Sequence, residues 1–71
     1  MKPLAVKELI NVLTENGFVI ARQRGSHIIF KHRISGIMVP VPLHGGNKPL
    51  PRGTFLAIIK QSKLPRHIFR K

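Results

Sequence analysis

Apolar residues recur with helical spacing near the beginning of the chain. Four of them share one face of a helix because they fall at positions i, i+3, i+4 and i+7: Val6, Leu9, Ile10 and Leu13. The pair Asn16-Gly17 should end this helix, since glycine readily adopts the left-handed conformation found after many helix C-termini. We expect contact between Leu13 and Phe18 to seal that end of the helix.

After Phe18 the pattern changes to short runs of β-branched and alternating residues. These runs predict three strands, at 18–24, 27–32 and 37–42, with turns at Gly25-Ser26 and at 33–36. The third strand contains Pro40 and Pro42, which lack the N–H group that a sheet requires. Because residues two apart direct their backbone groups to the same side, we expect the third strand to lie at an edge of the sheet.

A segment rich in glycine and proline follows, and a second helix is predicted at 52–62 with Phe55, Ile58 and Ile59 on one face. A last short turn should begin after Pro65. The order of helix, three strands and helix predicts an α+β fold with both helices on one face of a three-stranded antiparallel sheet. A length of 71 residues leaves room for one domain, 1–71.

The charge of the chain narrows the possible partners. Thirteen Lys and Arg residues face only two acids, Glu8 and Glu15, so the net charge is +11 at pH 7. Such a field favours a polyanion, of which nucleic acid is the commonest. The absence of cysteine excludes disulfides, thiolate zinc sites and thiol nucleophiles.

The same count of acids bears on metal and carboxylate chemistry. Two-metal nucleases and glycosidases need several carboxylates or a facing pair, whereas Glu8 and Glu15 lie seven residues apart on one predicted helix. His27 and His32 are five apart on a strand and should point to opposite faces. We therefore expect no metal and no cofactor. With no apolar run long enough for a membrane span and no signal-peptide pattern, we expect a soluble cytoplasmic protein.

The histidines are the remaining candidates for chemistry. RNA supplies its own nucleophile, the 2′-hydroxyl, so a nuclease needs only a base to deprotonate it and cations to stabilise the phosphorane. His27 would stand at the start of a strand after the Gly-Ser turn, near Arg22, Arg24 and Lys31. Arg22 and Arg24 share one strand face by parity, and so do His27 and Lys31. Whether the two faces coincide depends on register, which the sequence leaves open.

The alternative for each histidine is a plain structural or surface role. A histidine at the start of a strand is more often a surface or hydrogen-bonded residue than a catalytic one. His32 lies in a basic turn, which predicts a surface position. His44 lies in a Gly-rich loop, where it could touch phosphate, and His67 should contact solvent among Arg66 and Arg70.

Several motifs together resemble one protein family over about residues 5–69. The motifs are Gly17-Phe18, Arg24-Gly25-Ser26-His27 with Phe30, Val39-Pro40-Val41-Pro42 with His44 beyond, and Arg52-Gly53-Thr54 with Ile58. In this combination the chain resembles the HicA family of mRNA interferase toxins. The resemblance implies a fold like the double-stranded RNA-binding domain and metal-independent cleavage of mRNA, with the histidine of the Gly-Ser-His motif, His27, essential.

The resemblance also implies a HicB-type antitoxin that occludes the site, and growth arrest when the toxin is free. We expect RNA contacts from six residues: Arg22, Arg24, Ser26, Lys31, His44 and Lys48. Two alternatives stay open. The chain could be a non-catalytic RNA-binding module with the same fold, or a degenerate toxin that only binds its partner. The sequence does not give the RNA specificity, the general acid or the oligomeric state.

Overall fold

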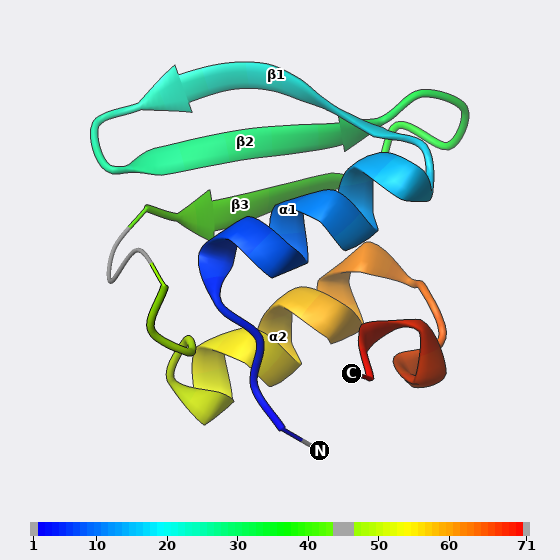
Figure 1. The fold of residues 1–71 in the computed structure, drawn as a ribbon. Helices are drawn as coiled ribbons and strands as arrows, with labels where there is room; N and C mark the ends of the chain where they lie inside the picture. Colours follow the sequence, from blue (N-terminus) through cyan, green and yellow to red (C-terminus); the bar gives the residue numbers. More distant parts are fainter. Residues whose placement is uncertain (1, 44–46, 71) are drawn as a thin grey trace.

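The computed structural model describes residues 2–43 and 47–70 and contains the expected elements in the expected order (Figure 1). They are α1 (Val6–Glu15), β1 (Phe18–Arg24), β2 (His27–His32), β3 (Met38–Pro42), α2 (Arg52–Ser62) and a short 3₁₀ helix η1 (Arg66–Phe69). The first two strands have the predicted bounds, and the third starts one residue later than predicted. Within the described parts of the chain, no helix is long and apolar enough to cross a membrane.

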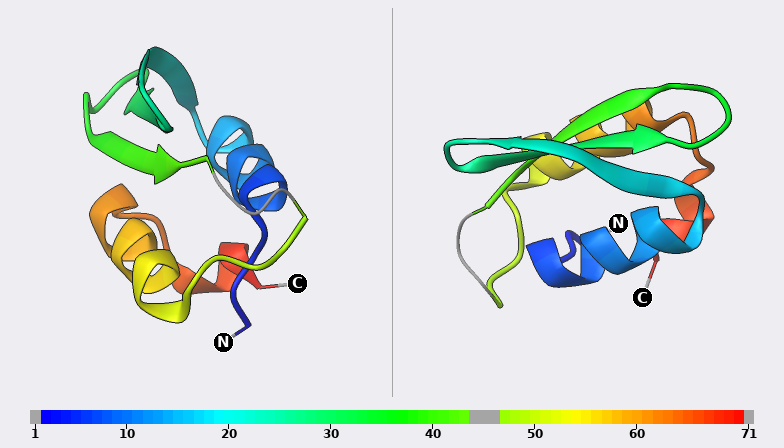
Figure 2. Two further views of the ribbon diagram at one scale, coloured as in Figure 1. Left: turned by 90° about the vertical axis from the view of Figure 1, so that its left-hand side faces the viewer. Right: turned by 90° about the horizontal axis from the view of Figure 1, so that it is seen from above.

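The three strands form one antiparallel sheet in the order β1-β2-β3, and both helices cover the same face of it (Figures 1 and 2). This arrangement confirms the predicted α+β fold and its likeness to the double-stranded RNA-binding domain. β3 lies at an edge of the sheet, as its two prolines predicted. The opposite face of the sheet is left uncovered by either helix (Figure 2).

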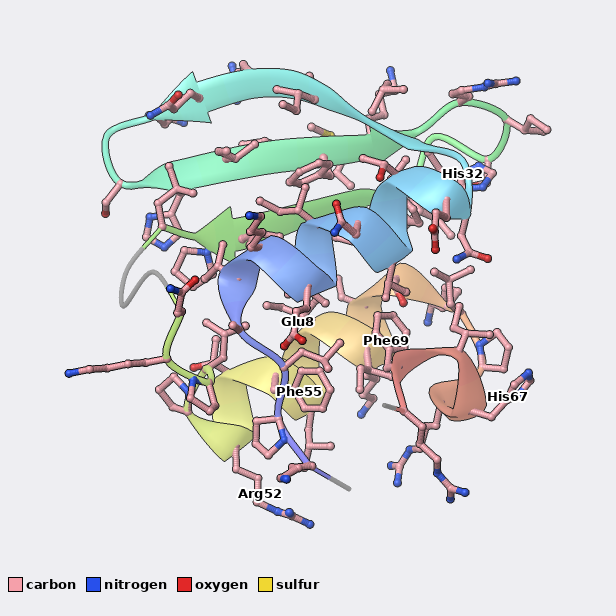
Figure 3. All side chains as sticks on the ribbon, viewed as in Figure 1. Glu8, His32, Arg52, Phe55, His67 and Phe69 are labelled. Carbon is pink, nitrogen blue, oxygen red and sulfur yellow. The ribbon has the colours of Figure 1, made fainter. Side chains whose placement is uncertain are left out.

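The core fills the space between the sheet and the helices. All four phenylalanines belong to it and none is more than 1% exposed: Phe18, Phe30, Phe55 and Phe69. Phe55 of α2 and Phe69 of η1 meet edge to face with ring centroids 6.2 Å apart (Figure 3). Because these rings are buried in the core, they are not exposed for stacking on nucleic-acid bases.

His32 is a structural residue, and the expectation of a surface position is wrong. Its Nδ1 accepts hydrogen bonds from the backbone N–H groups of Ile34 at 3.1 Å and Ser35 at 3.2 Å. Nε2 therefore carries the ring proton and donates it to the carbonyl oxygen of Asn16 at 3.0 Å. The ring also packs edge to face on Phe18. His32 thus ties the end of α1 to the β2–β3 turn (Figure 3).

Gly17 leaves the room that His32 needs. Its φ of +92° is a conformation that favours glycine, as the sequence predicted for this helix end. A Cβ atom at Gly17 would lie only 2.7 Å from Nε2 of His32. Because three hydrogen bonds hold the imidazole, it has little freedom to move away from such an atom.

We expect Gly17→Ala to destabilise the fold more than Gly36→Ala. Both glycines have positive φ, but a Cβ at Gly36 would meet only Lys31 at an ordinary 4.0 Å. Gly36→Ala should cost about 1–2 kcal/mol of backbone strain. Gly17→Ala should cost at least about 1 kcal/mol more, because it also crowds His32. Urea unfolding of the two variants measures the difference, and equal losses would show that His32 yields freely.

Candidate functional site

Gly25 and Ser26 close the β1–β2 hairpin and fix which residues face one another beside the loop. Gly25 has a φ of +55°, and a positive φ is required at the first central residue of a type II′ turn. Just outside the loop, Arg24 pairs with His27. Cross-strand partners have Cα atoms about 4.5–5.5 Å apart and direct their side chains to the same face. The short loop therefore sets Arg24 beside His27.

A β-bulge at Ala21 decides which face the arginines of β1 occupy. Ile20 pairs with Phe30 of β2. Two residues further along β1, Arg22 pairs with the adjacent Ile29, so β1 contains one residue more than β2 at this point. Strict alternation from the buried start of β1 would direct both arginines toward the helices. The extra residue reverses this parity, and both arginines point away from the core.

The uncovered face of the sheet carries three rows of side chains, each row with one residue from β1, β2 and β3. The rows are Arg24–His27–Pro42, Arg22–Ile29–Pro40 and Val19–Lys31–Met38.

The register answers the question that the sequence left open, because the two arginines share their face with His27 and Lys31. All four side chains are exposed. We call this set, Arg22, Arg24, His27 and Lys31, the basic sheet face. No Asp or Glu occurs in residues 18–43, so no carboxylate of the sheet neutralises it.

The prolines of β3 have a second effect that the sequence analysis missed. Pro40 and Pro42 alternate with Val39 and Val41, which are fully buried, so the proline rings lie on the uncovered face. Pro42 is the partner of His27 on the side opposite β1. The basic sheet face therefore ends at a rigid apolar border. The alternation with valines is the signal that could have revealed this.

The other predicted RNA contacts are less close together. Ser26 is exposed in the hairpin loop directly before His27. Lys48 lies elsewhere, because its neighbour Pro49 forms a bridge with the residue that precedes α1. The structure therefore does not bring Lys48 onto the basic sheet face. His44 lies outside the described residues.

The described histidines differ in their surroundings. His67 is exposed on η1, within the helix layer and away from the sheet (Figure 3). His32 lies at the opposite end of β2 from the hairpin loop and is used in the hydrogen bonds described above. Of these three, His27 alone has an exposed imidazole on the basic sheet face, next to a guanidinium group on the neighbouring strand.

This arrangement suits chemistry on a phosphodiester. An exposed imidazole can accept a proton from a substrate hydroxyl, and adjacent cations can stabilise charge that develops on phosphate oxygens. Among residues 2–43 and 47–70, no three His, Cys, Asp or Glu side chains come together in a group that could hold a metal ion. Among the described residues, His27 and the cations beside it are the side chains that this face offers to a phosphodiester.

Comparison with known proteins gives one family. A family model described as "HicA toxin of bacterial toxin-antitoxin" matches residues 6–64 of the 71-residue chain. The match covers all three strands and both α-helices, and it includes the whole basic sheet face. No curated protein matches the chain closely enough to count as a relative.

Two single-residue deletions test the role of the bulge. Deleting Ala21 leaves the present register intact, so affinity for a single-stranded RNA oligonucleotide should stay within about threefold. Deleting Gln23 instead would place Arg22 opposite Ile28, facing the helices, and loss of a charged phosphate contact should lower affinity about tenfold. Both variants have the same length, and circular dichroism checks their folding. Equal affinities would show that the face occupied by Arg22 does not matter.

Proposed function

Because the chain belongs to the HicA family of toxins of bacterial toxin–antitoxin systems, we propose that it is a metal-independent endoribonuclease that cleaves mRNA with His27 as the catalytic histidine. One observation carries the proposal. His27 is exposed on an uncovered sheet face with Arg24 as its direct partner across the hairpin. An exposed site of this kind is open to a long, flexible polyanion.

In the proposed reaction, His27 accepts the proton of a 2′-hydroxyl group, and the resulting oxygen attacks the adjacent phosphorus. The bond from phosphorus to the 5′-oxygen breaks, and that oxygen takes up a proton from water as it leaves, which gives a fragment with a 5′-hydroxyl group. The product is a 2′,3′-cyclic phosphate. Arg24 stabilises the additional negative charge of the phosphorane, since its guanidinium group can donate two parallel hydrogen bonds to phosphate oxygens.

The remaining cations hold the RNA backbone in place. Arg22 and Lys31 belong to the rows beyond His27 and would contact neighbouring phosphates. Ser26, Lys48 and His44 are further proposed contacts, of which Ser26 is closest to His27 in the chain. Phosphate contacts release counterions. On single-stranded RNA, log K should therefore fall by about 0.7 per phosphate contact for each tenfold rise in salt concentration.

An antitoxin partner follows from membership of the family, and we assign it to the HicB type. A protein of net charge +11 is captured fastest by an acidic partner. Covering the basic sheet face would bury His27 and exclude RNA in one step. Inhibition would then require no change in the toxin's conformation.

The catalytic assignment is tested by His27→Ala. His27 is exposed and contributes nothing to the core, so the variant should fold normally. Loss of a general base should slow RNA cleavage about 10²- to 10⁴-fold. His67→Ala is the matched control, because it removes another exposed imidazole away from the sheet and should cleave at the original rate. Undiminished cleavage by folded His27→Ala would favour a non-catalytic RNA-binding module.

The proposed nucleophile is tested by chelation and by product analysis. Excess EDTA should leave the cleavage rate unchanged, since the only carboxylate side chains, Glu8 and Glu15, both lie on α1, away from His27. The upstream fragment should end in a 2′,3′-cyclic phosphate or in the 3′-phosphate formed from it. Loss of cleavage in EDTA that magnesium restores would contradict the mechanism, as would a 3′-hydroxyl product.

A further inference from the structure

A hollow of about 530 Å³ lies in the helix layer, around the end of α2 and the start of η1. Its apolar lining includes Leu56, Ile59 and Leu64. Its charged lining consists of Lys60, Lys63 and Arg66, all of them exposed. We call these six residues the α2 hollow. It is a half-open hollow in the surface rather than an enclosed cavity.

The three cations of the α2 hollow have charged groups that are free to meet a ligand. Among the described residues, their side-chain nitrogens make no hydrogen bond or ion pair. Ser62 instead secures this turn, because its hydroxyl donates to the carbonyl oxygen of Ile59 at 2.7 Å and accepts from the N–H of Leu64 at 3.2 Å. The backbone that presents the cations is therefore well fixed.

Lys63 is the second indication that the hollow has a use. It has a φ of +65° in the left-handed conformation, and it is the only described non-glycine residue with a positive φ. Glycine normally fills such a position after a helix, because other residues are strained there. The residue in this strained position carries a cation into the lining of the hollow. Strain of this kind is typical of functional sites.

The chemistry of the lining indicates a protein segment. Aliphatic side chains offer neither hydrogen bonds nor aromatic rings to a nucleotide base, whereas they accept a leucine-like side chain well. The surrounding cations would form ion pairs with carboxylates of a partner. A second copy of this chain supplies only two, seven residues apart on α1, among 13 cations. The partner that fits both the apolar and the charged lining is an acidic protein segment with an apolar residue between carboxylates.

We propose that the α2 hollow docks an acidic, amphipathic segment of a protein partner, with an apolar side chain on Leu56, Ile59 and Leu64 and carboxylates on the three cations. The hollow lies at the end of α2 and the start of η1, in the layer of helices that covers one face of the sheet (Figure 2). The basic sheet face belongs to the other face of the sheet. Docking therefore leaves His27 accessible. The proposal does not depend on nuclease activity, so either can fail without the other.

The probe is a labelled helical peptide with two leucines four residues apart, surrounded by glutamates. We expect it to shift the backbone NMR signals of residues 56–66 and to leave those of residues 22–31 unchanged. A peptide with serines in place of the leucines should bind at least about tenfold more weakly, because the burial of the leucine side chains is lost.

Lys63→Gly provides a variant whose result cannot be ascribed to unfolding. Glycine relieves the positive φ, so the melting temperature should stay the same or rise, while peptide affinity should fall about two- to fivefold from the lost ionic contact. Lys60→Glu combined with Arg66→Glu should lower affinity about tenfold or more. The matched control is Lys7→Ala, which removes one charge from exposed α1 and should change affinity by less than about twofold.

Four results would overturn the proposal. Three of them concern the peptide: equal binding of the serine peptide, signal shifts in residues 22–31 instead of 56–66, and no binding at millimolar peptide. The fourth uses a 2′-deoxy oligonucleotide, which lacks the 2′-hydroxyl nucleophile, and is a stronger shift of residues 56–66 by this oligonucleotide than by the peptide. The last would assign the hollow to nucleic acid. RNA cleavage by Lys63→Gly should match that of the unaltered protein, which separates this test from that of His27.

Discussion

The site depends on a sheet that is covered on one face only. On such a sheet, a side chain's parity decides whether it enters the core or faces solvent, and a shift of one residue exchanges the two. Phe18 must enter the core at the start of β1, and simple alternation would send Arg22 and Arg24 after it. Buried, unpaired guanidinium groups are costly. The bulge at Ala21 satisfies both requirements, since it keeps the phenylalanine inside and the arginines outside.

The elements could be predicted from the sequence because each is encoded by neighbouring residues. The helical spacing before Gly17, the Gly-Ser loop and the two prolines of the edge strand all act over a few positions. Register is different, because two strand pairings were compatible with the local pattern. A hairpin with a three-residue loop at 24–26 and no bulge in β1 would fit the local pattern equally well. That hairpin would place Arg22 opposite Ile28. Only the tertiary requirement of an uncharged core selects the observed pairing.

His32 shows the same limit for single side chains. In the sequence it is one histidine of a basic turn, with nothing to distinguish it from a surface residue. Its role depends on Asn16, which is distant in the chain and becomes its neighbour only when β2 pairs with β1. His27, by contrast, was a candidate from its loop motif alone. The position of His27 follows from local geometry, whereas that of His32 follows from the assembled fold.

The two layers of the molecule present different side-chain chemistry to solvent. The sheet side offers cations and an imidazole to a polyanion, and the helix side offers cations around an apolar floor. The shortest dimension of the molecule is only 18 Å. At about 3.3–3.6 Å per residue, five or six extended residues span 18 Å. One acidic partner could therefore hold the α2 hollow with one segment and cover His27 with another. Linking two such contacts raises the effective concentration of the second, so inhibition would be tight even where each contact alone is weak.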